Sequence, residues 1–167
     1  EARHPTGTQA RLAFDLLAFT GCRRSDVILL GPAHVAMAPD GERIAYKAEK
    51  NNYKLNVPML PALRSSIGAT ATGGGHFLVN SLGRPWKPSS FSDRFKEWCK
   101  EAALPHCSAH GIRKAAACRV AEGGATEAQM MAIFGWENSK QAAVYIRKAS
   151  RGRMAGQAMD LLKREKN

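Results

Sequence analysis

The sequence lacks the patterns of a membrane protein, of a disulfide-rich protein and of a zinc protein. No apolar run approaches the roughly 20 residues that cross a bilayer, and the longest, at residues 12–19, contains Asp15. No Cys-x-x-Cys pair occurs, and no spacing of cysteine and histidine is typical of a zinc site. We therefore expect free thiols and no bound metal ion. The cysteines are Cys22, Cys99, Cys107 and Cys118.

Acidic side chains are also few. The 167 residues include 14 Asp and Glu against 25 Lys and Arg, which gives a formal net charge of +11 and an isoelectric point near 9.9. A surplus of this size favours binding to a polyanion such as a nucleic acid. It also fits a basic surface with no special partner, so charge alone does not decide the function. The basic residues are spread along the chain, which indicates a folded basic face and not a tail.

Turn and capping signals divide the chain into short elements. Thr8 is expected to cap a helix that ends before Gly21, and Thr126 with Gln129 has the pattern of a capping box. Turns at residues 39–41 and 51–52 separate short strands. We expect strands at residues 35–37, 43–47, 54–57 and 76–79, and later helices at 25–29, 61–67, 89–103, 108–122, 126–134, 139–148 and 150–166. This pattern predicts one domain of the α+β class, mostly helical with a small antiparallel sheet.

Two basic segments in the first third of the chain are suited to contact a phosphate. Residues 20–26 (TGCRRSD) place Arg23 and Arg24 at the junction of two expected helices, where a guanidinium and a helix N-terminus both favour an anion. The hairpin that follows carries Lys47, Lys50 and Lys54, and a lysine at a hairpin tip can enter a DNA groove or donate a proton. Taken singly, an arginine pair beside a helix cap and a solvated lysine-rich hairpin are common, so neither decides a function.

Two further signals lie in the last third of the chain. On a helix, His110 and Arg113 are three residues apart and share one face. Trp136 follows a glycine and precedes Tyr145 by nine positions. A His-x-x-Arg pair often arises by chance, and a lone helical tryptophan or tyrosine usually serves packing. His106 has no arginine three residues later and is interpreted as a loop residue.

Taken in this order, the four signals resemble the signature of the tyrosine recombinase family of phage integrases, which is Arg, Lys, His-x-x-Arg, His or Trp, and Tyr. The resemblance runs from about Thr8 to beyond Tyr145 and implies the family's DNA breaking-rejoining catalytic fold. It implies six catalytic residues, namely Arg23, Lys50, His110, Arg113, Trp136 and, as the nucleophile, Tyr145. It also implies Asp26 as a supporting acidic residue and, as DNA contacts, Arg24, Lys47, Lys54 and Lys114.

Two features of the assigned residues stand out: the choice of the lysine and the tryptophan at position 136. Lys50 is preferred to the other hairpin lysines because it lies eight residues before Pro58, the interval usual in the family. Most members carry histidine where this chain has Trp136. An indole donates a hydrogen bond but does not carry a proton. Acid and base roles are therefore expected of His110 and Lys50.

The family mechanism implies that Tyr145 attacks a DNA backbone phosphate, which gives a 3′-phosphotyrosine and a free 5′-hydroxyl. The resemblance assigns Arg23 and Arg113 to the phosphate charge, His110 to the phenolic proton and Lys50 to the leaving oxygen. The covalent link keeps the free energy of the phosphodiester. We therefore expect no ATP, no metal ion and no other cofactor.

The resemblance also implies the partners of the protein. These are double-stranded DNA and other recombinase subunits, assembled as a tetramer on DNA in the bacterial cytoplasm, with no membrane. A preceding DNA-binding domain, absent from residues 1–167, is expected. Two other functions stay open: DNA relaxation of the type IB topoisomerase kind, and DNA binding by a relative that has lost catalysis. The last helix carries an apolar stripe that packs either on a neighbouring subunit or on its own domain: Ala155, Ala158, Met159, Leu161 and Leu162.

Overall fold

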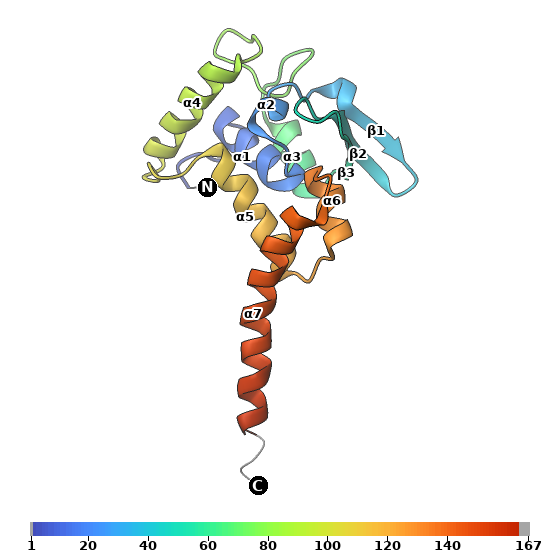
Figure 1. The fold of residues 1–167 in the computed structure, drawn as a ribbon. Coiled ribbons are helices and arrows are strands. Elements are labelled where there is room, and N and C mark those ends of the chain that lie inside the picture. Colours follow the sequence, from blue (N-terminus) through green and yellow to red (C-terminus); the bar gives the residue numbers. More distant parts are fainter. Residues whose placement is uncertain (1, 164–167) are drawn as a thin grey trace.

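The computed structural model describes residues 2–163, and within them the chain is mostly helical with one small sheet (Figure 1). In chain order the elements are α1 (Gln9–Thr20), α2 (Arg24–Val27), a 3-10 helix (Pro32–His34), β1 (Val35–Ala38), β2 (Gly41–Lys47), β3 (Lys54–Pro58), α3 (Pro61–Ala69), α4 (Pro88–Glu101), α5 (Ala109–Glu122), α6 (Glu127–Phe134) and α7 (Ser139–Lys163). The predicted α+β class is confirmed.

Local capping chemistry sets the ends of the helices that carry the predicted site. The Thr8 hydroxyl accepts a hydrogen bond from the backbone N–H of Arg11 at the start of α1 (3.2 Å). Gly21 ends this helix in the left-handed conformation, with φ 62°. Ser108 caps α5 by accepting from the N–H of Gly111 (3.1 Å), and Thr126 caps α6 in a capping box. Each of these ends was predicted from the residue type.

The sheet is antiparallel, with strand order β1-β2-β3. In β2 and β3, alternate side chains are buried, and their register places Ile44 opposite Val57 and Tyr46 opposite Leu55. The turn after β2 brings residues 48–53 to one end of the sheet, where the N–H of Ala48 donates to the carbonyl of Tyr53 (2.9 Å). The sheet thus holds the lysine hairpin at its rim.

Two clusters of buried side chains form the core. The larger one is built around α1 and includes Phe91, Phe95 and Trp98 of α4. The smaller one joins α5, α6 and the start of α7 around Phe134 and Trp136. The α5 helix contributes to both clusters and therefore connects the two parts of the molecule.

One expected strand and one expected break between helices are wrong. Residues 76–79 form no strand, and Val79 makes only an isolated bridge to Pro85. The two helices expected at residues 139–148 and 150–166 are one helix, α7, as far as Lys163; the end of that prediction lies outside the described residues. Neither proline nor glycine interrupts the chain between Tyr145 and Arg151, so the helix continues through Ser150.

The second half of α7 extends away from the rest of the chain (Figure 1). Its large apolar side chains are exposed, among them Met159 at 58%, Leu161 at 64% and Leu162 at 62%. The stripe therefore does not pack on its own domain. In residues 2–163 no helix combines the length and the apolar character that crossing a membrane requires.

The close approach of Gly21 to the second cluster gives a first prediction. A Cβ at this position would lie 2.6 Å from Cε1 of the buried Phe134 ring, and the backbone has positive φ. We expect Gly21→Ala to lower the free energy of unfolding by about 2–4 kcal/mol, from overpacking and left-handed strain together. Urea unfolding measures it. Gly68→Ala in α3, where a Cβ meets nothing within 4 Å, serves as the control and should not be destabilised. Equal stability of the two variants would contradict the packing.

Candidate active site

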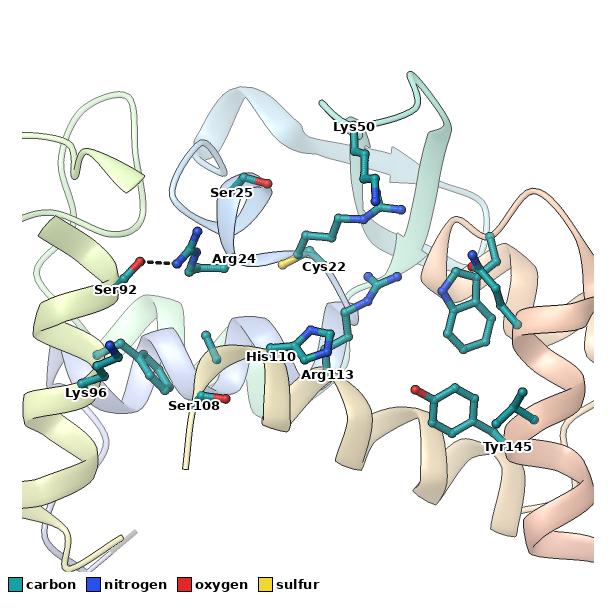
Figure 2. Close-up of a pocket in the computed structure, with 16 residues that line it drawn as sticks. Cys22, Arg24, Ser25, Lys50, Ser92, Lys96, Ser108, His110, Arg113 and Tyr145 are labelled. Atoms are coloured by element: carbon teal, nitrogen blue, oxygen red, sulfur yellow. Dashed lines mark hydrogen bonds between the residues drawn. The ribbon is translucent and has the colours of Figure 1, made fainter. Parts of the chain in front are cut away.

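A cleft of about 720 Å³ lies between the two clusters, and all six residues predicted as catalytic line it (Figure 2). They come from distant parts of the sequence: the α1–α2 junction, the turn after β2, the first turns of α5, the loop after α6 and the start of α7. The residues are Arg23, Lys50, His110, Arg113, Trp136 and Tyr145. The fold therefore gathers in one place side chains that the sequence separates by more than 120 positions.

Arg23 stands at the N-cap of α2 with a buried carboxylate behind it. Its Nη1 lies 3.9 Å from Oδ2 of Asp26, whose side chain is only 2% exposed. The other oxygen of Asp26, Oδ1, accepts a hydrogen bond from the backbone N–H of Glu49 in the hairpin turn (3.1 Å). Asp26 thus contacts both the arginine and the backbone of the lysine hairpin, and its supporting role stays a prediction.

Arg113 is buried and holds two helix ends together. Its guanidinium donates to the carbonyl of Gly21 and to the carbonyl of Phe134 (2.6 Å for the latter). Burial lowers the pKa of Arg113, and the neighbouring positive charge of Arg23 lowers it further. Since like charges held side by side repel, an anion between these two guanidinium groups is strongly favoured.

His110 lies one turn before Arg113 on α5 and is exposed to solvent. Figure 2 shows its imidazole beside the Arg113 guanidinium, at the floor of the cleft. The spacing of three residues thus puts both groups on one helix face, as predicted.

The rings of Phe134, Trp136 and Tyr145 form a stack, of which Trp136 and Tyr145 line one wall of the cleft. The centroids of Phe134 and Trp136 are 4.9 Å apart with an angle of 24° between the rings, and those of Trp136 and Tyr145 are 5.4 Å apart at 13°. The guanidinium carbon of Arg113 lies 5.4 Å from the Phe134 centroid. Figure 2 shows the Tyr145 hydroxyl pointing from this wall toward the His110 and Arg113 side of the cleft. Tyr145 therefore lines the same cleft as the two arginines of its own chain.

Tyr145 is the only one of the three tyrosines that lines the cleft, and all three lie in the described region. Tyr46 is buried on the inner face of the sheet, and burial raises the pKa of its hydroxyl above the usual range. Such a phenol stays neutral and out of reach of a substrate. Tyr53 is partly buried in the hairpin and packs against the larger cluster.

A family model described as "Phage integrase family" matches residues 1–151. This chain belongs to the phage integrase family. No curated protein matches its sequence significantly.

Solved structures of recombinases share the fold. They include XerA recombinase, with a TM-score of 0.69, 16% identity and coverage of 92% of this chain and 64% of that chain. XerH recombinase bound to a palindromic difH substrate, after cleavage, has a TM-score of 0.70, 15% identity and coverage of 89% and 44%. A lambda integrase dimer bound to a COC′ core site has a TM-score of 0.67, 18% identity and coverage of 83% and 42%. The predicted tyrosine-recombinase fold is confirmed, and this chain spans less than two thirds of each of these proteins.

The DNA contacts expected of this phage integrase domain lie in different places. Arg24 lines the cleft and donates to the hydroxyl of Ser92 on α4 (2.5 Å). Lys47 and Lys54 face each other in register at the base of the hairpin, exposed and outside the lining of the cleft. Lys114 follows Arg113 on α5 and is also exposed outside it. Their contacts with DNA stay predictions.

Sequence reasoning missed several residues that line the cleft. Ser92 and Lys96 stand one turn apart on α4 and face it from the side opposite Tyr145 (Figure 2). Their i, i+4 spacing beside the apolar face of Phe91, Phe95 and Trp98 was the available signal. Within residues 2–163, no group of three or more His, Cys, Asp or Glu side chains is placed to hold a metal ion.

The two carbonyls bound by Arg113 make it a structural residue as well as a site residue. Lysine cannot reach both acceptors, so we expect Arg113→Lys to leave a buried carbonyl without a donor and to cost about 1–3 kcal/mol in the free energy of unfolding. Urea unfolding measures this. Lys114→Ala, at the exposed next position, is the control and should change the value by less than about 0.5 kcal/mol. An unchanged unfolding midpoint for Arg113→Lys would show that the two bonds do not hold the helix ends.

The buried thiol of Cys22 gives a prediction about its reactivity at pH 8. Burial raises the pKa of its thiol to about 12. Alkylation requires the thiolate, and a thiol with a raised pKa is still protonated at pH 8. We expect iodoacetamide at pH 8 to leave Cys22 unlabelled in the folded chain while the half-buried Cys118 reacts, and to label all four cysteines in urea. Peptide mass mapping distinguishes the sites. Labelling of Cys22 as fast as Cys118 in the folded chain would contradict the burial.

Proposed function

We propose that this chain is the catalytic domain of a site-specific DNA recombinase, which cuts and rejoins DNA strands through a covalent bond between Tyr145 and a backbone phosphate. The supporting observation is one arrangement: a tyrosine hydroxyl that points into a cleft toward Arg113 and His110, with Arg23 and Lys50 on the same cleft. A phosphodiester is an anion with no easily displaced group. Cleaving it requires a held nucleophile, positive charge on its nonbridging oxygens and a proton for the leaving oxygen.

The two arginines supply the charge. Arg113 has two of its N–H groups committed to carbonyls, which fixes the plane of its guanidinium and leaves the other donors for a nonbridging oxygen. Arg23 stands beside Arg113, with the carboxylate of Asp26 behind. The indole N–H of Trp136 is a further donor at the wall, and this residue holds the Tyr145 ring by stacking. Because these groups are fixed before DNA binds, little reorganisation is needed during the reaction.

The proton transfers fall to His110 and Lys50. As Tyr145 Oη bonds to phosphorus, the phenolic proton passes to His110, and the bond from phosphorus to O5′ breaks. Lys50 donates a proton to O5′, which leaves as a hydroxyl. Rejoining is the reverse, with a 5′-hydroxyl of the same or another strand as nucleophile. The phosphotyrosine keeps the energy of the broken bond and the side chains provide the charge, so we propose that neither ATP nor a metal ion takes part.

The proposed partners are double-stranded DNA and further copies of the protein. The net charge of +11 favours DNA. The similar lambda integrase structure contains a dimer bound to a core site. The exposed apolar face of α7 offers a contact for a second copy, in an assembly that we expect to be a tetramer on DNA in the bacterial cytoplasm.

The nucleophile is tested by Tyr145→Phe. The ring and its stack on Trp136 remain, so we expect DNA binding within about twofold of the parent, less than about 0.5 kcal/mol. Covalent product should fall by at least about 10³-fold because the attacking oxygen is gone. A nicked suicide duplex traps the adduct, and denaturing gels quantify it. Tyr53→Phe is the matched control and should form the adduct normally. An adduct formed by Tyr145→Phe would refute the assignment, and supercoil relaxation without strand exchange by the parent would favour topoisomerase activity.

A further inference from the structure

Asn51, which follows Lys50, joins three parts of the site through its side chain. Its Oδ1 accepts a hydrogen bond from Nη1 of Arg23 at 3.4 Å. Its Nδ2 donates to the carbonyl of Gly135 at 3.1 Å, at the peptide that leads into Trp136. The orientation of the amide follows from these partners, since a guanidinium only donates and a carbonyl only accepts.

The contact between the hairpin and the Gly135 turn has a second, independent support in packing. Gly135 is buried and has positive φ, and a Cβ there would lie 3.2 Å from Cδ1 of Leu55 in β3. The hairpin therefore lies against this turn through its strand as well as through Asn51. A side chain at the turn would separate the two.

The backbone on both sides of Lys50 is tied down while its own side chain is free to move. On one side, the N–H of Glu49 donates to Asp26 Oδ1 (3.1 Å). On the other, Asn51 makes the two bonds described above, and the N–H of Asn52 donates to the carbonyl of Ala48 (2.9 Å). Lys50 itself is exposed, and its side chain points from the turn into the cleft that Arg23 also lines (Figure 2). The turn thus aims a flexible amine at the centre of the cleft.

We propose that Asn51 is a positioning residue for Lys50: it docks the hairpin turn on Arg23 and on the Gly135 carbonyl, and so places the amine where it can protonate the leaving oxygen. This inference rests on the proposed function. Without Asn51, the Glu49 tie remains, but the turn loses its link to the opposite wall. The Lys50 amine then samples a larger volume, and the fraction of time it spends at O5′ falls.

The experiment separates proton donation from the other roles of the site by changing the leaving atom. In a suicide duplex with a 5′-bridging phosphorothiolate, sulfur replaces O5′ and leaves as a thiolate, which needs no proton donor. Tyr145 Oη still bonds to phosphorus, and the phosphorus–sulfur bond breaks. Lys50→Ala is the reference and should be slow on the oxygen substrate but near the parent rate on the sulfur substrate.

For Asn51→Ala we expect cleavage of the oxygen substrate to slow by about 10- to 100-fold, with the sulfur substrate cleaved within about threefold of the parent rate. Such a rescue also shows that the variant is folded and that Arg23 and Arg113 still stabilise the charge on the phosphate. Asn51→Asp keeps an acceptor for Arg23 but loses the donor to Gly135, so it should show the same selective loss if the tie to the opposite wall matters. Asn56→Ala is the control: this residue lies in β3 on the same hairpin, and its side chain accepts a hydrogen bond from Arg43 outside the cleft. The variant should cleave both substrates like the parent.

Two results would overturn the inference. Equal loss on both substrates would mean that Asn51 acts on Arg23, on Trp136 or on the fold, and not through Lys50. Parent rates for Asn51→Ala on both substrates would mean that the two hydrogen bonds do not position the amine. A parent chain that forms no adduct with either substrate would refute the proposed function itself, which is a different failure.

Discussion

The bonds from Arg113 to the Gly21 and Phe134 carbonyls are the interaction on which the rest of the site depends. Helix α1 ends at Gly21 and α6 ends at Phe134, so each carbonyl is a group that a helix end leaves without an intrahelical partner. Arg113, on α5, satisfies both at once. One buried side chain therefore fixes the position of Arg23, two residues after Gly21, and of Trp136, two residues after Phe134.

Holding the buried Arg113 guanidinium beside that of Arg23 costs electrostatic free energy, and an anion bound next to them lowers this cost. A cation is buried beside a second cation, which the lowered pKa of Arg113 reflects. The carbonyl dipoles, the aromatic faces of Phe134 and Trp136, and the carboxylate of Asp26 offset part of that cost. None of them neutralises the outward side of the guanidinium pair. The same packing that keeps the domain folded thus leaves positive charge directed into the cleft, where it favours an anion.

The order of the chemical residues was predictable from the sequence, but their connections were not. Arg23, His110, Arg113, Trp136 and Tyr145 stand out because each has a recognisable spacing within a short segment. From the sequence, Asn51 indicated only a turn. Its hydrogen-bond partners, Arg23 and Gly135, lie 28 and 84 positions away, so no local pattern predicts them. The helix ends at Gly21 and Gly135 were set by local chemistry. The continuity of α7 was harder to predict, because it depends on the lack of a helix-breaking residue, and Ser150 after Ala149 does not break the helix.

The unbroken course of α7 places the tyrosine and the exposed apolar face on one helix. At its start, Ala142 is buried and Tyr145 stacks on Trp136, so the first turns are held by the second cluster. Gly152 and Gly156 follow, and each glycine weakens an exposed helix by about 1 kcal/mol relative to alanine. The helix is therefore least stable between Tyr145 and the apolar side chains near its end. The second cluster holds the part of α7 that carries the phenol, and its exposed far half depends on its own helical hydrogen bonds.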